Sequence, residues 1–305
     1  MTAARYTIID LGSNSFHMLT VSKQGNGFNV VSKHKQKVRL AAGLNGHKQL
    51  DQTTMQRGWA CLENFRLLLD QIQPVTVLIT ATAALRIAVN NKAFIEVAEN
   101  ILGHPINLIS GIQEAKTIFK GVCYTEQTDK KLLVIDIGGA STELVVGQGH
   151  QVHIANSLNI GCVTWLSHYF ADQQLNEYNF NNAINAARQV ISSVKTQYSA
   201  FDWELTLGAS GTIQAVNEVN QVQQLSDSLS FELLQQIKQQ CIACNTIEQL
   251  NIAGLEASRM PVFASGLAIL IALFESLNIQ QMQLSNGALR EGLISMMFNG
   301  QSKFS

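Results

Sequence analysis

The stretch "LLVIDIGGASTELVVG" at residues 132 to 147 decides the fold. Four apolar residues lead into Asp136, and an apolar, strand-like segment resumes at Leu144. A plain hairpin needs only two turn residues of the Asn-Gly kind. The longer turn here combines bare glycine backbone with small hydroxyl side chains, which can donate hydrogen bonds to phosphate oxygens. For this segment alone, a glycine-rich tight turn without a ligand is an open alternative.

A second copy of the pattern lies at residues 7 to 21, "TIIDLGSNSFHMLTV", and aligns with the first without a gap. The matched pairs are Asp10 with Asp136, Gly12 with Gly138, Ser15 with Ser141, and His17 with Glu143. The offset is 126 residues (136 − 10), which is longer than the roughly 20–50-residue period of a solenoid. Two related lobes are therefore expected, with two acidic loops facing each other across a cleft.

Composition favours a cytoplasmic enzyme that binds any polyanion locally. Hydrophobic residues make up 46% of the 305 residues, and the net charge is −1, so no overall positive field predicts a nucleic-acid or membrane partner. No signal peptide is expected, and the apolar segment 261–277 is shorter than the roughly 20 residues of a membrane span. The five scattered cysteines are expected to be reduced thiols. The densest basic run is "SKHKQKVR" at 32–39.

The order of predicted elements gives the fold class. Strands are expected near 5–11, 16–22, 28–33, 75–80, 106–110, 132–137, 143–147, 152–158, 203–209 and 281–285. Helices are expected at 52–72, 83–90, 92–102, from 113, at 175–197, from 211, and at 231–243, 262–277 and 288–298. This duplicated order predicts an α/β protein with two ribonuclease-H-like lobes, as in the actin and sugar-kinase superfamily. Each lobe should be a mixed sheet flanked by helices, 1–125 and 126–305, with the active site between them.

Polar loops follow the ends of several strands, where ligands of open α/β sheets gather. The segments "IDLGSNSFHM", "LISG" followed by "QEA", "VIDIGGASTELVVG", "GASGTI" and "GALREG" occur in that order. In this set and spacing the chain resembles the exopolyphosphatase and guanosine pentaphosphate phosphohydrolase family over essentially its whole length. It looks like the short, two-domain form, since longer members carry an additional helical domain.

The resemblance implies that Glu114 is the catalytic base that orients and deprotonates the attacking water. A surface glutamate that favours the dipole of its helix is the alternative reading. The carboxylates of Asp136 and Glu143 flank one turn and could converge on Mg²⁺, which prefers hard oxygen ligands, and Asp10 is a further candidate. The predicted phosphate-binding residues are Gly12, Ser13, Asn14, Ser15, Arg86, Gly138, Gly139, Ser141, Thr142, Gly208, Ser210 and Gly211. Three positions depart from the family pattern: Gln113, Ala140 and Asn286.

The expected activity is magnesium-dependent release of orthophosphate from inorganic polyphosphate, guanosine pentaphosphate, or both. A phosphotransferase of the same superfamily and a non-catalytic guanosine alarmone-binding regulator are the alternatives. A homodimer is expected from the resemblance, and neither a nucleic acid nor a membrane is an expected partner.

Overall fold

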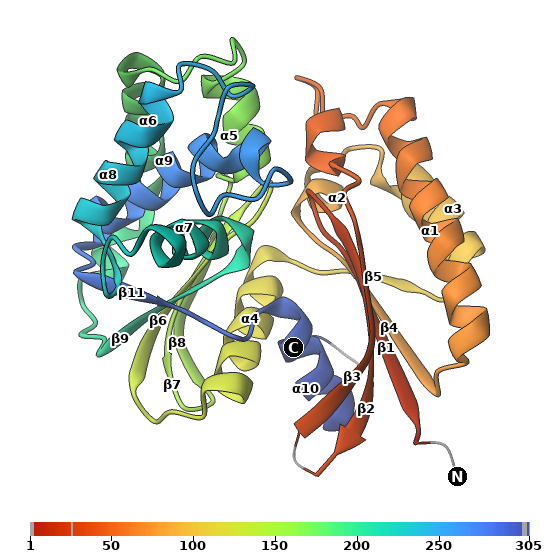
Figure 1. Ribbon diagram of the computed structural model, residues 1–305. Helices are drawn as coiled ribbons and strands as arrows, with labels where there is room; N and C mark the ends of the chain where they lie inside the picture. The colour runs from red at the N-terminus through yellow and green to blue at the C-terminus, as the bar shows by residue number, and fades with distance from the viewer. Residues whose placement is uncertain (1–2, 26, 301–303, 305) are drawn as a thin grey trace.

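Two mixed β-sheets, each flanked by helices, form two lobes (Figure 1). The computed structural model describes residues 3–25, 27–300 and 304. In each sheet three consecutive strands pair antiparallel, and later strands join in parallel beside the first of the three. The second sheet ends in a further short strand that pairs antiparallel with its neighbour. The predicted fold of two ribonuclease-H-like lobes is confirmed.

The first lobe has five strands in the order β3-β2-β1-β4-β5. Their bounds are β1 (Arg5–Leu11), β2 (Phe16–Gln24), β3 (Gly27–Gln36), β4 (Thr76–Ala81) and β5 (Ile106–Leu108). The helical segments are the short 3-10 helix η1 (Leu40–Gly43), α1 (Gln52–Ile72), α2 (Ala83–Ile87) and α3 (Asn91–Leu102). Asp51 caps α1: its carboxylate accepts a hydrogen bond of 2.7 Å from the backbone N–H of Thr54, which satisfies a free donor of the first turn.

The second lobe has six strands in the order β10-β11-β9-β6-β7-β8. Their bounds are β6 (Lys131–Ile137), β7 (Thr142–Gln148), β8 (Gln151–Leu158), β9 (Leu205–Ala209), β10 (Leu229–Ser230) and β11 (Gln281–Leu284). The helices are α5 (Cys162–Tyr169), α6 (Glu177–Tyr198), α7 (Ser210–Gln223), α8 (Phe231–Ala243) and α9 (Met260–Leu277). The pairing registers match across the lobes, because Asp10 faces His17 and Asp136 faces Glu143.

Helices α4 (Gly111–Glu126) and α10 (Leu289–Phe298) lie between the lobes (Figure 1). Helix α4 packs on β7, β8 and α10, and α10 also contacts β1 of the first sheet. Gly121 and Gly292 allow the two helix backbones to touch: a Cβ on either would overlap a backbone carbonyl oxygen of the other helix. The last helix therefore packs against the first lobe. The domain boundary expected at residues 125 and 126 stays a prediction, and it coincides with the end of α4.

The hydrophobic core of the first lobe contains residues of the second. Ala140, from the loop between β6 and β7, is 1% exposed and packs in this core together with Cys162 and Val163. The methyl group at position 140, where the related family commonly has glycine, therefore fills first-lobe core volume. A separate core joins Ile8 and other first-sheet residues to α4 and α10.

Helix α9 is the central helix of the second lobe. By length and composition it could cross a membrane, but 72% of it is buried inside the protein. The predicted helix at 262–277 is thus confirmed, and this segment belongs to the hydrophobic core of the second lobe.

Several local features differ from the sequence expectation. Helix α5, strand β10 and the 3-10 helix were not predicted, β3 extends to Gln36, and α2 ends at Ile87 instead of 90. The sequence of α5, "CVTWLSHY", is rich in β-branched and aromatic residues that give no clear helical period. Its position is set by packing on α9 and α6.

Candidate active site

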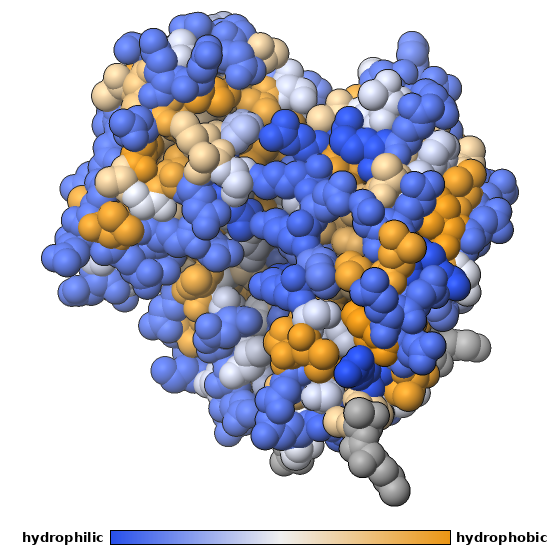
Figure 2. All heavy atoms as spheres, turned by 45° about the vertical axis from the view of Figure 1, so that its right-hand side comes forward, coloured by the Kyte–Doolittle hydropathy of each residue, from blue (hydrophilic) through white to orange (hydrophobic). Residues whose placement is uncertain are grey.

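The two glycine-containing loops, after β1 and after β6, both line a cleft of about 580 Å³ between the lobes. Their contact is close: a Cβ on Gly139 would lie 2.9 Å from Ser13 Cβ and 3.2 Å from the backbone nitrogen of Asn14. Figure 2 shows mainly hydrophilic side chains along the hollow between the lobes. Glycine at 139 is therefore required for the two loops to approach each other.

Most of the predicted phosphate-binding residues line this cleft. Those on its surface are Gly12, Ser13, Asn14, Ser15, Gly138, Gly139, Ser141, Ser210 and Gly211. Two of the serines also fix the loops: Ser13 Oγ accepts a hydrogen bond of 3.0 Å from Ala84, and Ser210 Oγ accepts one of 3.1 Å from Ile137. Ser210 has φ 81°, a conformation that a residue with a side chain rarely adopts and that is concentrated at functional sites.

Three predicted phosphate-binding residues lie elsewhere. The hydroxyl of Thr142 donates a hydrogen bond of 2.7 Å to the carbonyl of Ile160. A Cβ on Gly208 would collide with Ile213 and Met282, so this glycine serves packing under the sheet. Arg86 donates a hydrogen bond of 2.9 Å to Glu114 Oε2 and one of 3.0 Å to a backbone carbonyl. None of these three residues is among those that line the cleft.

Glu114 lies in the first turn of α4 and is 7% exposed. The helix begins there because Ser110 and Gln113 form a capping box, each side chain bonding the other residue's backbone. Gln113, which replaces an acid of the related family, thus points at the cap and not into the cleft. Burial raises the pKa of Glu114, and the charge and hydrogen bond of Arg86 oppose that rise.

Three further carboxylates surround Glu114. Burial raises the pKa of Asp136 to about 7, and the charges of Glu114 and Asp10 add to the rise. Burial also raises the pKa of Asp10 to about 7, with Glu114 contributing. The pKa of Glu143 is raised well above its usual value by burial and by the charges of Glu114 and Asp136. Glu143 lies behind the cleft surface, 2% exposed, with Oε1 accepting a 2.7 Å hydrogen bond from a serine hydroxyl.

This donor set fits a hard divalent cation. Asp10 Oδ1 is buried and has no hydrogen-bond partner in the described part of the chain. Mutually repelling buried carboxylates gain most from a positive charge between them. Within residues 3–25 and 27–300, no three His, Cys, Asp or Glu side chains are gathered as a complete metal site. One or two carboxylates with water and substrate oxygens would therefore have to complete the coordination.

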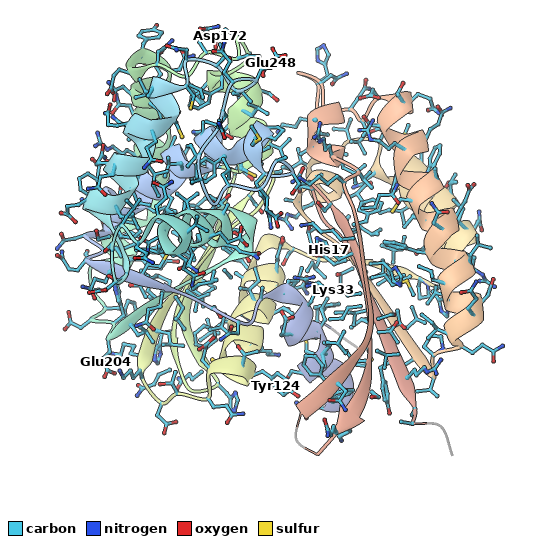
Figure 3. All side chains as sticks on the ribbon, in the orientation of Figure 1. His17, Lys33, Tyr124, Asp172, Glu204 and Glu248 are labelled. Atoms are coloured by element: carbon cyan, nitrogen blue, oxygen red, sulfur yellow. The ribbon has the colours of Figure 1, made fainter. Side chains whose placement is uncertain are left out.

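A row of cations that was not predicted from the sequence lines the cleft. Lys33 and Lys35 occupy alternate positions of β3 and line the cleft with Arg259 and Arg290. Figure 3 labels Lys33 and His17, which lie on the first sheet at the side facing the second lobe. The alternation of lysines along this strand could have predicted the row, because successive side chains of a strand point to opposite faces and alternate residues therefore share one face. Arg290 lies inside "GALREG", but no role was predicted for it.

The sequence of the chain is similar to those of a known enzyme family. A family model described as the Ppx/GppA phosphatase family matches residues 19–300. The guanosine-5'-triphosphate,3'-diphosphate pyrophosphatase of Vibrio cholerae serotype O1 is 49% identical over 292 residues, which cover 96% of this chain and 59% of that relative. The chain thus spans less than two thirds of the length of this curated relative.

Solved structures share the fold. The crystal structure of an exopolyphosphatase from Cytophaga hutchinsonii has a TM-score of 0.87 at 23% identity, covering 97% of this chain and 98% of that one. The Ppx/GppA family member from Aquifex aeolicus has a TM-score of 0.79 at 21% identity, covering 98% and 99%. Because the family match extends over residues 19–300, the chain belongs to the Ppx/GppA phosphatase family.

Proposed function

We propose that this chain is a phosphoanhydride hydrolase that releases terminal orthophosphate from guanosine pentaphosphate, inorganic polyphosphate, or both. The observation that carries the proposal is the placement of Glu114, a buried carboxylate that lines the same cleft as both serine- and glycine-containing loops. A carboxylate beside a phosphate-binding surface can orient a water molecule and take its proton as the water attacks phosphorus.

Arg86 would hold this base in position. Its guanidinium binds Glu114 Oε2 at 2.9 Å, while no hydrogen bond of Oε1 is found in the described residues. We assign Oε1 to the attacking water. The raised pKa of Glu114, caused by burial, makes it a stronger proton acceptor than an exposed glutamate. Arg86 thus acts on the base, in place of the phosphate contact that was predicted for it.

The substrate's phosphates would lie between the two loops, where backbone N–H groups and serine hydroxyls donate to phosphate oxygens. Three members of the cationic row, Lys33, Lys35 and Arg259, would hold the anionic part of the substrate that extends away from the reacting end. Donors fixed in a partly closed cleft stabilise developing charge more than mobile water does.

Enzymes of this family are metal-dependent, and we propose Mg²⁺ held by Asp136 and Asp10, with Glu143 supporting Asp136 from behind. The bound cation would supply charge neutralisation at the phosphate oxygens. We expect Asp136→Asn and Glu143→Gln each to raise the Mg²⁺ concentration for half-maximal rate by about 10-fold or more. Glu248→Gln, on an exposed residue far from the cleft (Figure 3), is the control. Unchanged Mg²⁺ titrations in both cleft variants would rule out this site.

Lys35 predicts a pH dependence of binding. Burial and the nearby Arg259 and Lys37 lower its pKa to about 8, so its charge is present below that pH and lost above it. We expect the affinity for tripolyphosphate, measured by calorimetry, to fall as the pH rises from about 7 to 9. Lys35→Met should weaken binding about 10-fold at pH 7 and flatten this profile. The same profile in Lys35→Met as in the exposed-residue control Lys195→Met would contradict the assignment.

The test of the function is orthophosphate release from both substrates in oxygen-18 water, with and without Mg²⁺. Each released orthophosphate should carry one label. Phosphate transferred to ADP or a sugar would identify a phosphotransferase, and tight binding of the guanosine nucleotide without release would identify a regulator. The ratio of the two hydrolysis rates assigns the preferred substrate. A homodimer stays a prediction of the family resemblance, and a cytoplasmic location stays a prediction of the composition.

A further inference from the structure

Arg290 joins the two lobes at the cleft. It is the second residue of α10, which follows the last strand of the second lobe. Its Nη1 atom lies 3.2 Å from Nδ1 of His17, on β2 of the first lobe. Figure 1 shows α10 between the two lobes, and Figure 3 shows His17 at the side of the first sheet that faces it.

The contact with Arg290 defines which ring nitrogen of His17 carries the proton. A guanidinium can only donate hydrogen bonds, so Nδ1 of His17 is the acceptor and the ring proton resides on Nε2. Burial, together with the charges of Arg290 and Lys35, lowers the pKa of His17. Both the contact with Arg290 and the lowered pKa favour the neutral imidazole, which serves as a fixed acceptor for one guanidinium N–H.

Arg290 keeps its remaining donors for a ligand. It lines the cleft with Asp10 and Asp136, and its charge lowers the pKa of both carboxyl groups. In the described part of the chain no carboxylate lies within ion-pair distance of its guanidinium, whereas Arg86 is paired with Glu114. A guanidinium has five N–H donors in a planar fork that matches phosphate oxygens.

We propose that Arg290 is a catalytic residue that binds the oxygens of the phosphoryl group between the two acidic loops, and that His17 is the positioning residue that fixes its guanidinium. This assignment rests on the proposed function, since it requires a phosphoanhydride in the cleft. It also explains why the first lobe has histidine where the second has Glu143. A carboxylate on β2 would pair with Arg290 and withdraw it from the phosphate.

The first measurement is turnover. We expect Arg290→Gln to lower kcat about 10²–10³-fold, as for loss of one charge-stabilising donor, and Arg290→Ala to regain activity on addition of free guanidinium. His17→Phe should lower kcat about 10-fold, and His17→Asn, which keeps an acceptor near the Nδ1 position, should recover most of that loss. Arg188→Gln, which removes a surface ion pair with Glu275, is the control.

A double-mutant cycle separates positioning from a structural role. If His17 acts through Arg290, His17→Phe has no further effect on kcat in the Arg290→Gln background. Losses that multiply, or an Arg290→Gln variant with more than a third of the normal kcat, would overturn the assignment.

Binding without turnover distinguishes this proposal from the proposed function. In the Glu114→Gln background, Arg290→Gln should weaken tripolyphosphate binding about 10-fold by calorimetry, with the same Tm as its parent. Equal affinity would overturn the role of Arg290 even if the wild type hydrolyses both substrates. Absence of hydrolysis by the wild type, with this loss of affinity present, would overturn the proposed function and the catalytic role of Arg290, while its binding of phosphate oxygens would stand.

Discussion

Glu114→Gln is expected to lower kcat by about 10²–10⁴-fold, the range typical for loss of a general base. The amide keeps the shape of the side chain, and it can still accept a hydrogen bond from Arg86, but it cannot take a proton from water. Substrate affinity should change little, because the phosphates are held by the loops and the cationic row. Single-turnover rates of phosphate release and tripolyphosphate calorimetry measure the two effects separately.

A matched control is available in the same kind of helix position. Glu232 also lies in the first turn of a helix, α8, and is exposed. Glu232→Gln should leave kcat within twofold of the wild type. If Glu114→Gln keeps more than about a tenth of the normal kcat while its Tm is unchanged, Glu114 is not the base.

Gly121→Ala is expected to destabilise the protein by about 3 kcal/mol, although glycine in a helix interior ordinarily costs about 1 kcal/mol relative to alanine. Packing at position 121 decides whether the substitution stabilises or destabilises the protein. A methyl group at position 121 would overlap the carbonyl oxygen of Ala288 and crowd the backbone nitrogen of Gly292, so α10 has to move. Because backbone atoms on both sides cannot rotate away as a side chain would, the clash outweighs the gain in helix propensity.

The same displacement should affect catalysis. Helix α4 carries Glu114 and α10 carries Arg290, and a misplacement of about 1 Å can cost roughly 10²-fold in rate. We expect a fall in Tm of roughly 6 °C or more together with a lower kcat, measured by calorimetry and phosphate release. Gly46→Ala is the control, since a Cβ there meets nothing within 4 Å. A higher Tm for Gly121→Ala would show that the two helices do not touch at this point.

The fold was predictable from sequence because it is repeated within the chain. Asp10 and Asp136 end equivalent buried strands, and the alternation of strands and helices after each gave both sheets. Short elements were not predictable in this way. The two residues of β10 become a strand only through pairing with Met282 and Gln281, more than 50 residues away, and no local pattern encodes such a partner.

The site was predictable to the extent that its residues lie in local motifs. Thr142 shares the glycine loop with residues that line the cleft, yet its hydroxyl bonds Ile160, and nothing in the motif indicates which hydroxyls face inward. Lys35 resembles an ordinary charged residue on an edge strand. Its role as part of a cationic row depends on Arg259, which the fold brings across from the start of α9.

The sharing of core residues between the lobes sets an order of events on the ribosome. The first lobe lacks core atoms until Ala140, Cys162 and Val163 have been synthesised. The core that joins Val21 to Ile294 spans 273 residues (294 − 21), which at roughly 5–20 residues per second take roughly 14–55 s to translate. During that interval the apolar face of the first sheet lacks its packing partner, and such transiently exposed surfaces are prone to aggregate.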